Sequence, residues 1–227
     1  MTRSRRHVAR GFWALTLASL ALAISLAVRA PTEVSMGTVQ KVFYLHLPVA
    51  IHTFVAALAV FVAGAGYLAM RDARWDALGH AAAEVTLLNG TVLLLTGSFW
   101  ARIAWGQWWT WSPRLTFSLL LWLLYAALLV VRSMVPSPER RALVCAIYGV
   151  VAFLDVPLVY LSVKLLPDIH PESIQLTNEL RVVLAAWFVP ITLLTLGLIA
   201  ARYGVLRAGA SAEADRAASV AAAGAHP

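Results

Sequence analysis

The stretch FYLHLPVAIHTFVAALAVFVAGAGYLA, residues 43–69, contains no Asp, Glu, Lys or Arg. A helix needs about 20 mostly apolar residues to cross the hydrocarbon core of a bilayer. Residues 43–69 are long enough, and we expect them to form a membrane-spanning helix. Five further runs of similar character lie on either side, at residues 11–30, 83–103, 115–135, 142–163 and 182–203.

The composition agrees with a membrane location. Hydrophobic residues make up 61% of the 227-residue chain and charged residues 13%, with a mean hydropathy of +0.77. Soluble domains usually have about a quarter of their residues charged. The run at 11–30 follows a basic start, as a signal peptide would, but it is too long and lacks a clear cleavage site. We therefore predict an all-α integral membrane protein with six transmembrane helices.

Basic residues predict the orientation. Six spans divide the 18 Lys and Arg residues into 12 on the side of the termini and 6 on the other side. The richer side is cytoplasmic by the positive-inside rule, so both termini are expected in the cytoplasm. The net charge of +7 is then explained by the orientation in the membrane, and we do not expect nucleic-acid binding.

The chain divides into a membrane domain at residues 1–207 and an Ala-rich tail at residues 208–227. The tail lacks the bulky side chains that a core needs, so we expect it to be disordered in the cytoplasm. Cys145 is the single cysteine, which excludes an intramolecular disulfide or a CxxC relay. We expect it to be a small buried side chain.

A tryptophan-rich segment at residues 104–116 lies on the outer side in this topology. It includes WGQWWTWSPRLT, with four of the chain's nine tryptophans: Trp105, Trp108, Trp109 and Trp111. If residues 105–109 were helical, the first three of these would share a face and offer a platform to a flat apolar ligand. Gly106 and Pro113 make a long helix through the segment improbable. The alternative interpretation is an aromatic belt that anchors the protein at the interface.

Two histidines from distant parts of the chain reach the same side. His46 is at the outer end of the 43–69 helix, and His170 lies between Pro167 and Pro171 in the last outer segment. Two imidazoles can hold a haem iron from opposite faces. The alternative is a pair of ordinary interfacial histidines. His52 lies deeper, where a hydrogen bond inside the bundle is expected.

Three basic residues accompany these segments on the outer side. Arg114 follows the tryptophans, and an arginine there could pair with a haem propionate. The alternative is that its side chain extends from a helix end toward water, which is the favoured interpretation for Arg102 and Lys41.

These segments resemble those of a known protein family. WGQWWTWSPRLT resembles the tryptophan-rich WGxWWxWDxRLT signature (the WWD motif) of haem-handling proteins of cytochrome c maturation. Six spans with one histidine before the motif and one after it resemble the CcmC type, known as haem exporter protein C. KVFYLHLPVA and LDVPLVYLSVKLLPDIHPESI are similar to that family's two histidine segments, and the likeness covers about residues 36–203.

The resemblance implies a function. Such proteins bind haem b non-covalently at the outer, periplasmic face of the bacterial inner membrane. They load it onto the haem chaperone CcmE, in association with CcmA, CcmB and CcmD. By this resemblance His46 and His170 become the axial ligands of the haem iron, and the haem platform becomes Trp105, Gly106, Trp108, Trp109, Trp111 and Arg114.

The chain departs from the pattern in two places. Ser112 and Pro113 stand where the pattern has Asp and a small residue, and LLPDI replaces the tryptophans that often precede the second histidine. The first departure removes a carboxylate. Pro113 also lacks a backbone N–H and has a fixed φ.

Other functions remain open at this point. A haem ligase of the same family usually has more spans and histidines. The permease subunit of a cassette transporter would need partner ATPases, because the chain has no P-loop sequence. A scaffold would use the aromatic segment as an anchor alone. We expect no enzymatic activity from the chain itself.

Overall fold

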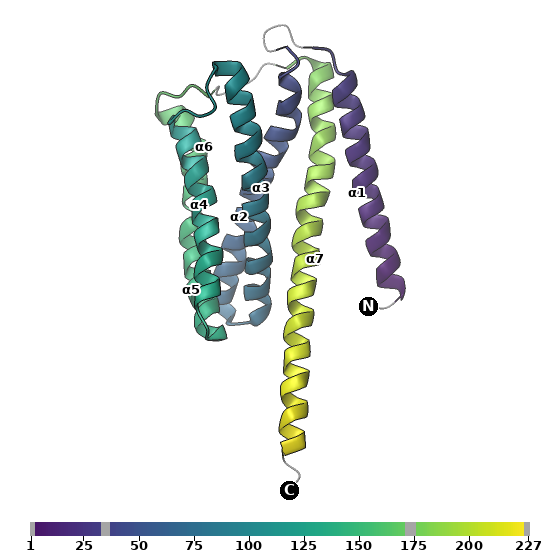
Figure 1. Cartoon of the computed structure of the whole chain (residues 1–227), viewed down its shortest axis with the longest axis vertical. Helices are drawn as coiled ribbons and strands as arrows, with labels where there is room; N and C mark the ends of the chain where they lie inside the picture. Colours follow the sequence, from purple (N-terminus) through teal and green to yellow (C-terminus); the bar gives the residue numbers. More distant parts are fainter. Residues whose placement is uncertain (1–2, 33–36, 171–175, 225–227) are drawn as a thin grey trace.

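The computed structural model describes residues 3–32, 37–170 and 176–224, whose regular secondary structure is helical with no β-strand in these ranges. Figure 1 shows the seven helices of the described residues. They are α1 (Arg3–Arg29), α2 (Gln40–Met70), α3 (Ala73–Trp105), α4 (Pro113–Met134), α5 (Pro138–Ala152), α6 (Asp155–Leu165) and α7 (Asn178–Gly224).

Within the described residues, six helical segments are long and apolar enough to cross a membrane, which confirms the predicted number. The predicted span at 142–163 is not one continuous helix, because a turn at Phe153 and Leu154 separates α5 from α6. Pro157 explains the break. Proline lacks the N–H that would bond to the Phe153 carbonyl. The Val156 N–H donates to the Phe153 carbonyl instead, at 3.0 Å.

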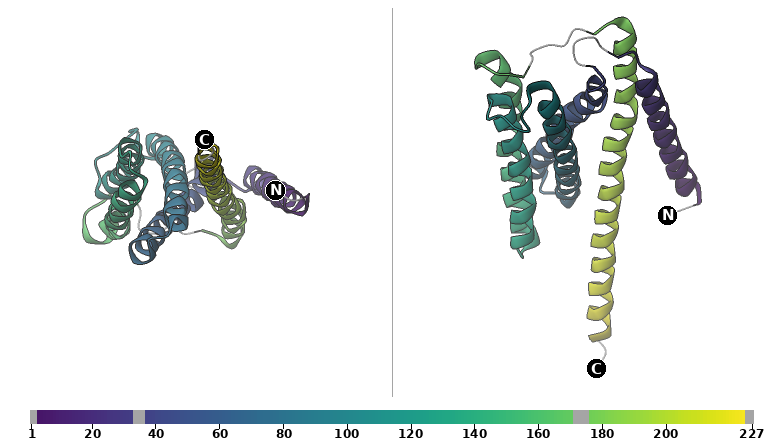
Figure 2. Two further views of the ribbon diagram at one scale, coloured as in Figure 1. Left: turned by 90° about the horizontal axis from the view of Figure 1, so that it is seen from below. Right: turned by 45° about the horizontal axis from the view of Figure 1, so that its top comes forward.

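The helices stand roughly side by side, and α2 packs against α3, α5 and α7. At one edge α1 packs against α7, and at the other α4 packs against α5 and α6, as the two views of Figure 2 also show. The described ends of the chain lie at the same end of the bundle as the α2–α3 and α4–α5 connections (Figure 1). The tryptophan-rich segment therefore lies at the opposite end.

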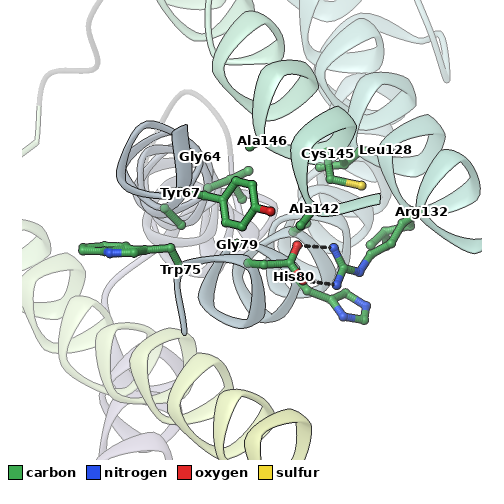
Figure 3. A pocket seen from close by; sticks show the side chains of 15 residues that line it. Gly64, Tyr67, Trp75, Gly79, His80, Leu128, Arg132, Ala142, Cys145 and Ala146 are labelled. Atoms are coloured by element: carbon green, nitrogen blue, oxygen red, sulfur yellow. Dashed lines mark hydrogen bonds and ion pairs between the residues drawn. The ribbon is translucent and has the colours of Figure 1, made fainter. Parts of the chain in front are cut away.

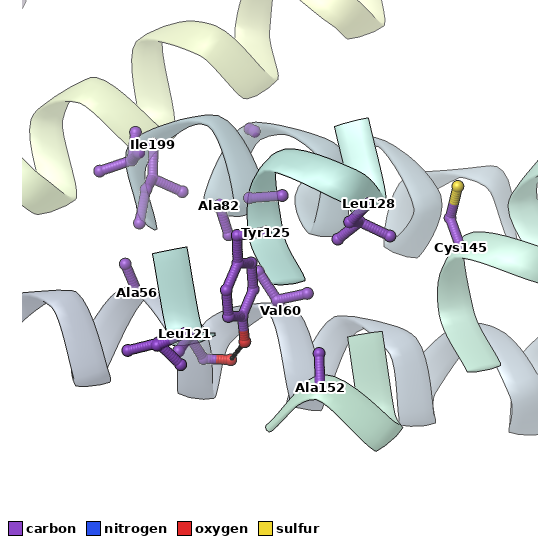
Figure 4. Close-up of a cluster of buried hydrophobic side chains, with 13 residues drawn as sticks. Ala56, Val60, Ala82, Leu121, Tyr125, Leu128, Cys145, Ala152 and Ile199 are labelled. Carbon is purple, nitrogen blue, oxygen red and sulfur yellow. Dashed lines mark hydrogen bonds between the residues drawn. The ribbon is translucent and has the colours of Figure 1, made fainter. Parts of the chain in front are cut away.

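Small residues bring the central helices together. Ala56 and Ala57 of α2 and residues 81–83 of α3 are almost completely buried in one cluster (Figure 4). Small side chains let membrane helices approach closely, where packing and not hydrophobic transfer drives association. Tyr125 of α4 is fully buried in this cluster. Its hydroxyl lies 3.5 Å from the Ala57 carbonyl.

Charged residues join the helices near the end where the termini lie. The Arg132 guanidinium donates to both carboxylate oxygens of Asp76 at 2.7 Å, which links α4 to α3. Arg202 of α7 donates to Glu84 of α3, and His80 lies 3.1 Å from the same carboxylate. Figure 3 shows Arg132 and His80 at a small pocket of about 340 Å³. Ion pairs within spans need such partners, so this end is closely tied together.

Cys145 is buried and free of a disulfide, as expected for a single cysteine. Helix α7 continues through Gly224, so it includes residues 208–224 of the Ala-rich tail. Alanine has the highest helix propensity, which accounts for helical backbone there. Residues 207–221 are exposed throughout. The tail is therefore a helix without tertiary packing over these residues.

Candidate functional site

An apolar cavity opens at the end of the bundle opposite the termini. It has a volume of about 1080 Å³, including the space at its mouth, and it lies between α2, α3, α4 and α6. The polar groups on its wall include His46, His170 and Arg114. The rest is mainly aromatic and aliphatic, including Phe43, Ile51, Leu93, Trp100, Trp105, Trp109, Leu115 and Tyr160. An apolar pocket with a few convergent polar groups is the usual form of a site for an organic ligand.

His46 projects into this cavity from α2 and is 9% exposed. Its Nδ1 lies 2.9 Å from Thr96 Oγ1. The Thr96 hydroxyl already donates its single proton to the Val92 carbonyl at 2.7 Å, so it accepts from His46. Nδ1 therefore carries the hydrogen, and Nε2 carries a lone pair. This is the tautomer in which a second group holds a histidine ready to bind a metal through Nε2.

Gly97 of α3 leaves room for the His46 ring. A Cβ atom added at Gly97 would lie 3.1 Å from Cε1 of His46. Such a contact is closer than an ordinary van der Waals approach. The glycine thus permits the close approach of α3 to the imidazole, and the position of the ring depends on it.

His170 reaches the cavity from the segment after α6, and its surroundings differ. Its backbone N–H donates to Asp168 Oδ1 at 2.8 Å. The Arg114 guanidinium lies 3.3 Å from its Nδ1. Arginine can donate but cannot accept, so Nδ1 of His170 accepts in this contact. The His170 ring also meets the edge of Trp105, with the ring centroids 6.4 Å apart.

Trp100 brings the two histidines together. Its ring centroid is 5.9 Å from that of His46 and 6.2 Å from that of His170. The side chain is 3% exposed. The sequence interpretation missed this residue, because it precedes the conspicuous tryptophan-rich stretch. It lies one helical turn from Thr96 on α3, and no spacing in the sequence singles it out beforehand.

The predicted platform divides into two parts. Trp105 and Trp109 line the cavity, whereas Trp108 and Trp111 are 55% and 76% exposed. Residues 105–109 do not form the helix that would place three tryptophans on one face. Helix α3 ends at Trp105, and Gly106 adopts a left-handed φ of +73°. Gly106 thus ends the helix and turns the chain, which is the role that glycine fills most readily.

The three basic residues also differ in their location. Arg114 is half-buried on the cavity wall, and among the described residues its Nε has no hydrogen-bond partner. Arg102 donates to the Gly106 carbonyl, and Lys41 donates to the Val28 carbonyl at 2.8 Å. These two cations thus satisfy carbonyls near helix C-termini and are not on the cavity wall.

His52 has the structural role that its depth predicted. Its Nδ1 lies 2.7 Å from the Pro48 carbonyl and its Nε2 lies 2.8 Å from Thr192 Oγ1 of α7. Both ring nitrogens are therefore engaged, and the residue links α2 to α7.

Comparison with known proteins identifies the family. A profile described as "Heme exporter protein C" matches residues 1–220. A protein of that name from Bradyrhizobium diazoefficiens is 30% identical over 203 residues, which cover 86% of this chain and 77% of the relative.

Two further relatives are slightly less similar in sequence. A putative cytochrome c biosynthesis ccmC-like mitochondrial protein of Arabidopsis thaliana is 29% identical over 76% of this chain and 65% of its own length. The heme exporter protein C of Escherichia coli K12 is 25% identical over 66% of this chain and 62% of its own length. Together with the match over nearly the whole chain, these relatives establish that the protein belongs to the heme exporter protein C (CcmC) family of cytochrome c biogenesis.

Proposed function

We propose that this chain holds haem b non-covalently at the outer face of the membrane and presents it to a haem chaperone of the CcmE type. The observation that carries the proposal is the meeting of His46 and His170 at one apolar cavity, beside Trp100 and Trp105. Imidazoles supply axial ligands to haem iron, and indole faces suit a flat ring.

The cavity wall fits a porphyrin in chemistry. Its indole and aliphatic groups would exclude water from the ring, and apolar burial contributes about 25 cal/mol per Å². His46 offers a lone pair on Nε2 without any rearrangement, because Thr96 holds its other nitrogen.

His170 requires a rearrangement that His46 does not. To ligate iron through Nε2 as a neutral imidazole, its Nδ1 must carry a hydrogen. The Arg114 guanidinium must then leave Nδ1, where it now donates. Once released, Arg114 can pair with a propionate carboxylate, which arginine binds in bidentate fashion. Ligation by His170 and recognition of a propionate by Arg114 are thereby linked.

The location of the cavity supports presentation at one face. Its end of the bundle is opposite the described chain ends, which we propose to be cytoplasmic from the distribution of Lys and Arg. The cavity would thus open to the periplasm from the bacterial inner membrane. The CcmA, CcmB and CcmD components would act with this chain, whose own role is binding and release without a catalysed reaction.

A path through the bundle has less support. The closely packed cluster that contains Tyr125 and Leu121, each at most 1% exposed, occupies the centre of the bundle. The small pocket at Arg132 lies at the other end. Binding at one face therefore fits this arrangement better than a permease function.

Reconstitution of the purified chain with haem tests the binding. We expect a Soret band with low-spin features that is lost or converted to high spin in His46→Ala and His170→Ala. His7→Ala is the matched control, because His7 is exposed on α1 and lies outside the cavity. A chain that stays colourless after haem is added, while remaining folded, would contradict the proposal.

Cross-linking tests the presentation. A photo-reactive group at the exposed Trp111 should capture a CcmE-type chaperone in a haem-dependent manner. Capture of apocytochrome in place of the chaperone would favour a ligase and overturn presentation.

A further inference from the structure

The start of α4 lacks a cap of its own. Ser112 occupies the N-cap position with extended backbone, but its side chain makes no capping hydrogen bond. Its buried Oγ has no partner among the described residues. Pro113 at the first helical position has no N–H to satisfy. The first donor that needs an acceptor is therefore the N–H of Arg114, on the cavity wall.

Asp168 supplies that acceptor from another segment. Its Oδ2 accepts from the Arg114 N–H at 2.8 Å, and its Oδ1 accepts from the His170 N–H, also at 2.8 Å. One carboxylate thus joins the start of α4 to the segment that carries His170. A negative charge at a helix N-terminus is also favoured by the helix dipole.

We propose that Asp168 is a positioning residue that holds His170 at the cavity by anchoring its segment to the N-terminus of α4. The proposal rests on the proposed function for the role of His170 as a ligand, whereas the anchor itself is independent of haem. The WWD-like motif and the LLPDI segment are then connected. A carboxylate is absent at Ser112 within the motif, and Asp168 of LLPDI caps the same helix from outside it.

This arrangement predicts that the effect of Ser112→Asp depends on Asp168. Asp is among the preferred N-cap residues, so Asp at 112 could cap Arg114 locally. Beside Asp168 it would place two carboxylates at one donor, where like charges repel. In the Asp168→Ala background it would restore the cap of α4 but could not bind the His170 N–H.

Amide hydrogen exchange of the haem-free chain tests the anchor. We expect Asp168→Ala to speed exchange of the Arg114 and His170 amides about tenfold, since losing a cap opens the first turn. Adding Ser112→Asp should restore protection at Arg114 and leave His170 fast. Asp72→Ala is the matched control, because Asp72 caps α3 at the other end by accepting from Arg74 at 2.8 Å. Unchanged exchange of both amides in Asp168→Ala would overturn the anchor.

The haem spectrum of the same variants tests the positioning role. We expect Asp168→Ala to lower the low-spin fraction at least threefold, and the double variant to stay low because its His170 N–H still lacks the Asp168 carboxylate. Recovery of the low-spin spectrum in the double variant would overturn the role in placing His170, since the cap alone would then suffice. If the unaltered chain bound no haem, the proposed function would fail while the exchange measurement still decided the anchor.

Discussion

His46 and His170 reach the same cavity by opposite means. His46 is on a long helix, is 9% exposed, and has its tautomer set by Thr96. His170 is on an irregular segment, is half-buried, and has Arg114 at the nitrogen that must carry a hydrogen before the ring can ligate. Under the proposed function, this difference would make His46 the permanent ligand and His170 the exchangeable one.

The difference would be useful if the chain presents haem and then releases it, as we propose. A bound group with two equally rigid ligands would be hard to release. If one ligand is on a segment attached through Asp168 and Arg114, a receiving protein can displace that ligand while the other retains the cargo. We therefore expect handover to begin at His170.

The largest expected effect separates the two histidines directly. His46→Ala should abolish retention of haem during purification, because the ligand prepared for binding is lost. His170→Ala should retain part of the haem in a high-spin, five-coordinate form through His46. Absorption spectra of both purified variants provide the measurement. Equal loss of haem in the two variants would break the comparison.

Thr96→Val tests the fixed tautomer of His46. Removing the hydroxyl takes away the acceptor for Nδ1–H, and loss of such a partner typically costs about 10–100-fold in metal affinity. We expect about a tenfold rise in the haem dissociation constant, measured by titration. Thr96→Ser, which keeps the hydroxyl, is the control and should stay within about twofold of the unaltered chain. A Thr96→Val variant with unchanged affinity would show that the tautomer needs no support.

Tryptophans on the cavity wall should matter more for haem binding than exposed tryptophans. Trp109→Ala removes part of the apolar wall and should weaken haem binding about fivefold, from the area that it exposes. Trp111→Ala, at a 76% exposed position, should leave the haem affinity within about twofold. Parallel titrations measure both. A larger loss in Trp111→Ala than in Trp109→Ala would contradict the division.

The smallest effect is expected at Gly97. Gly97→Ala places a Cβ atom 3.1 Å from the His46 ring, which must shift by a few tenths of an ångström. We expect about a threefold weaker haem affinity, because small displacements of a ligand cost little when the ring can adjust. Gly204→Ala of α7 is the control, since a Cβ there meets no atom within 4 Å. Equal haem affinities in the two variants would show that α3 does not constrain the position of His46.

The sequence predicted the parts of the fold that depend on hydrophobic length. Six spans follow from six apolar runs, because each run must by itself satisfy its backbone inside the bilayer. The break at Phe153 and Leu154 depends on one residue, Pro157, inside an otherwise continuous apolar run, so a count of apolar residues does not reveal it.

The site was predictable where single residues are conspicuous. His46, His170, Trp105, Trp109 and Arg114 were named from the sequence, and the structure places all five on one cavity. Their roles toward haem stay predictions. Exposure of Trp108 and Trp111 could not be read from spacing, because it depends on where α3 ends.

The supporting residues were missed for a physical reason. Thr96 and Asp168 are common residue types whose importance arises from partners 50 and 54 positions away in the sequence. Such contacts depend on how helices and segments pack, and no local pattern in the chain records them.

Electron paramagnetic resonance of the ferric, haem-loaded full chain tests the central claim most directly. If His46 and His170 hold one iron between them, the unaltered chain gives a low-spin bis-imidazole signal. His170→Ala should convert this signal to high spin, and exogenous imidazole should restore it. A high-spin signal in the unaltered chain, or a low-spin signal that survives both His46→Ala and His170→Ala, would contradict the account.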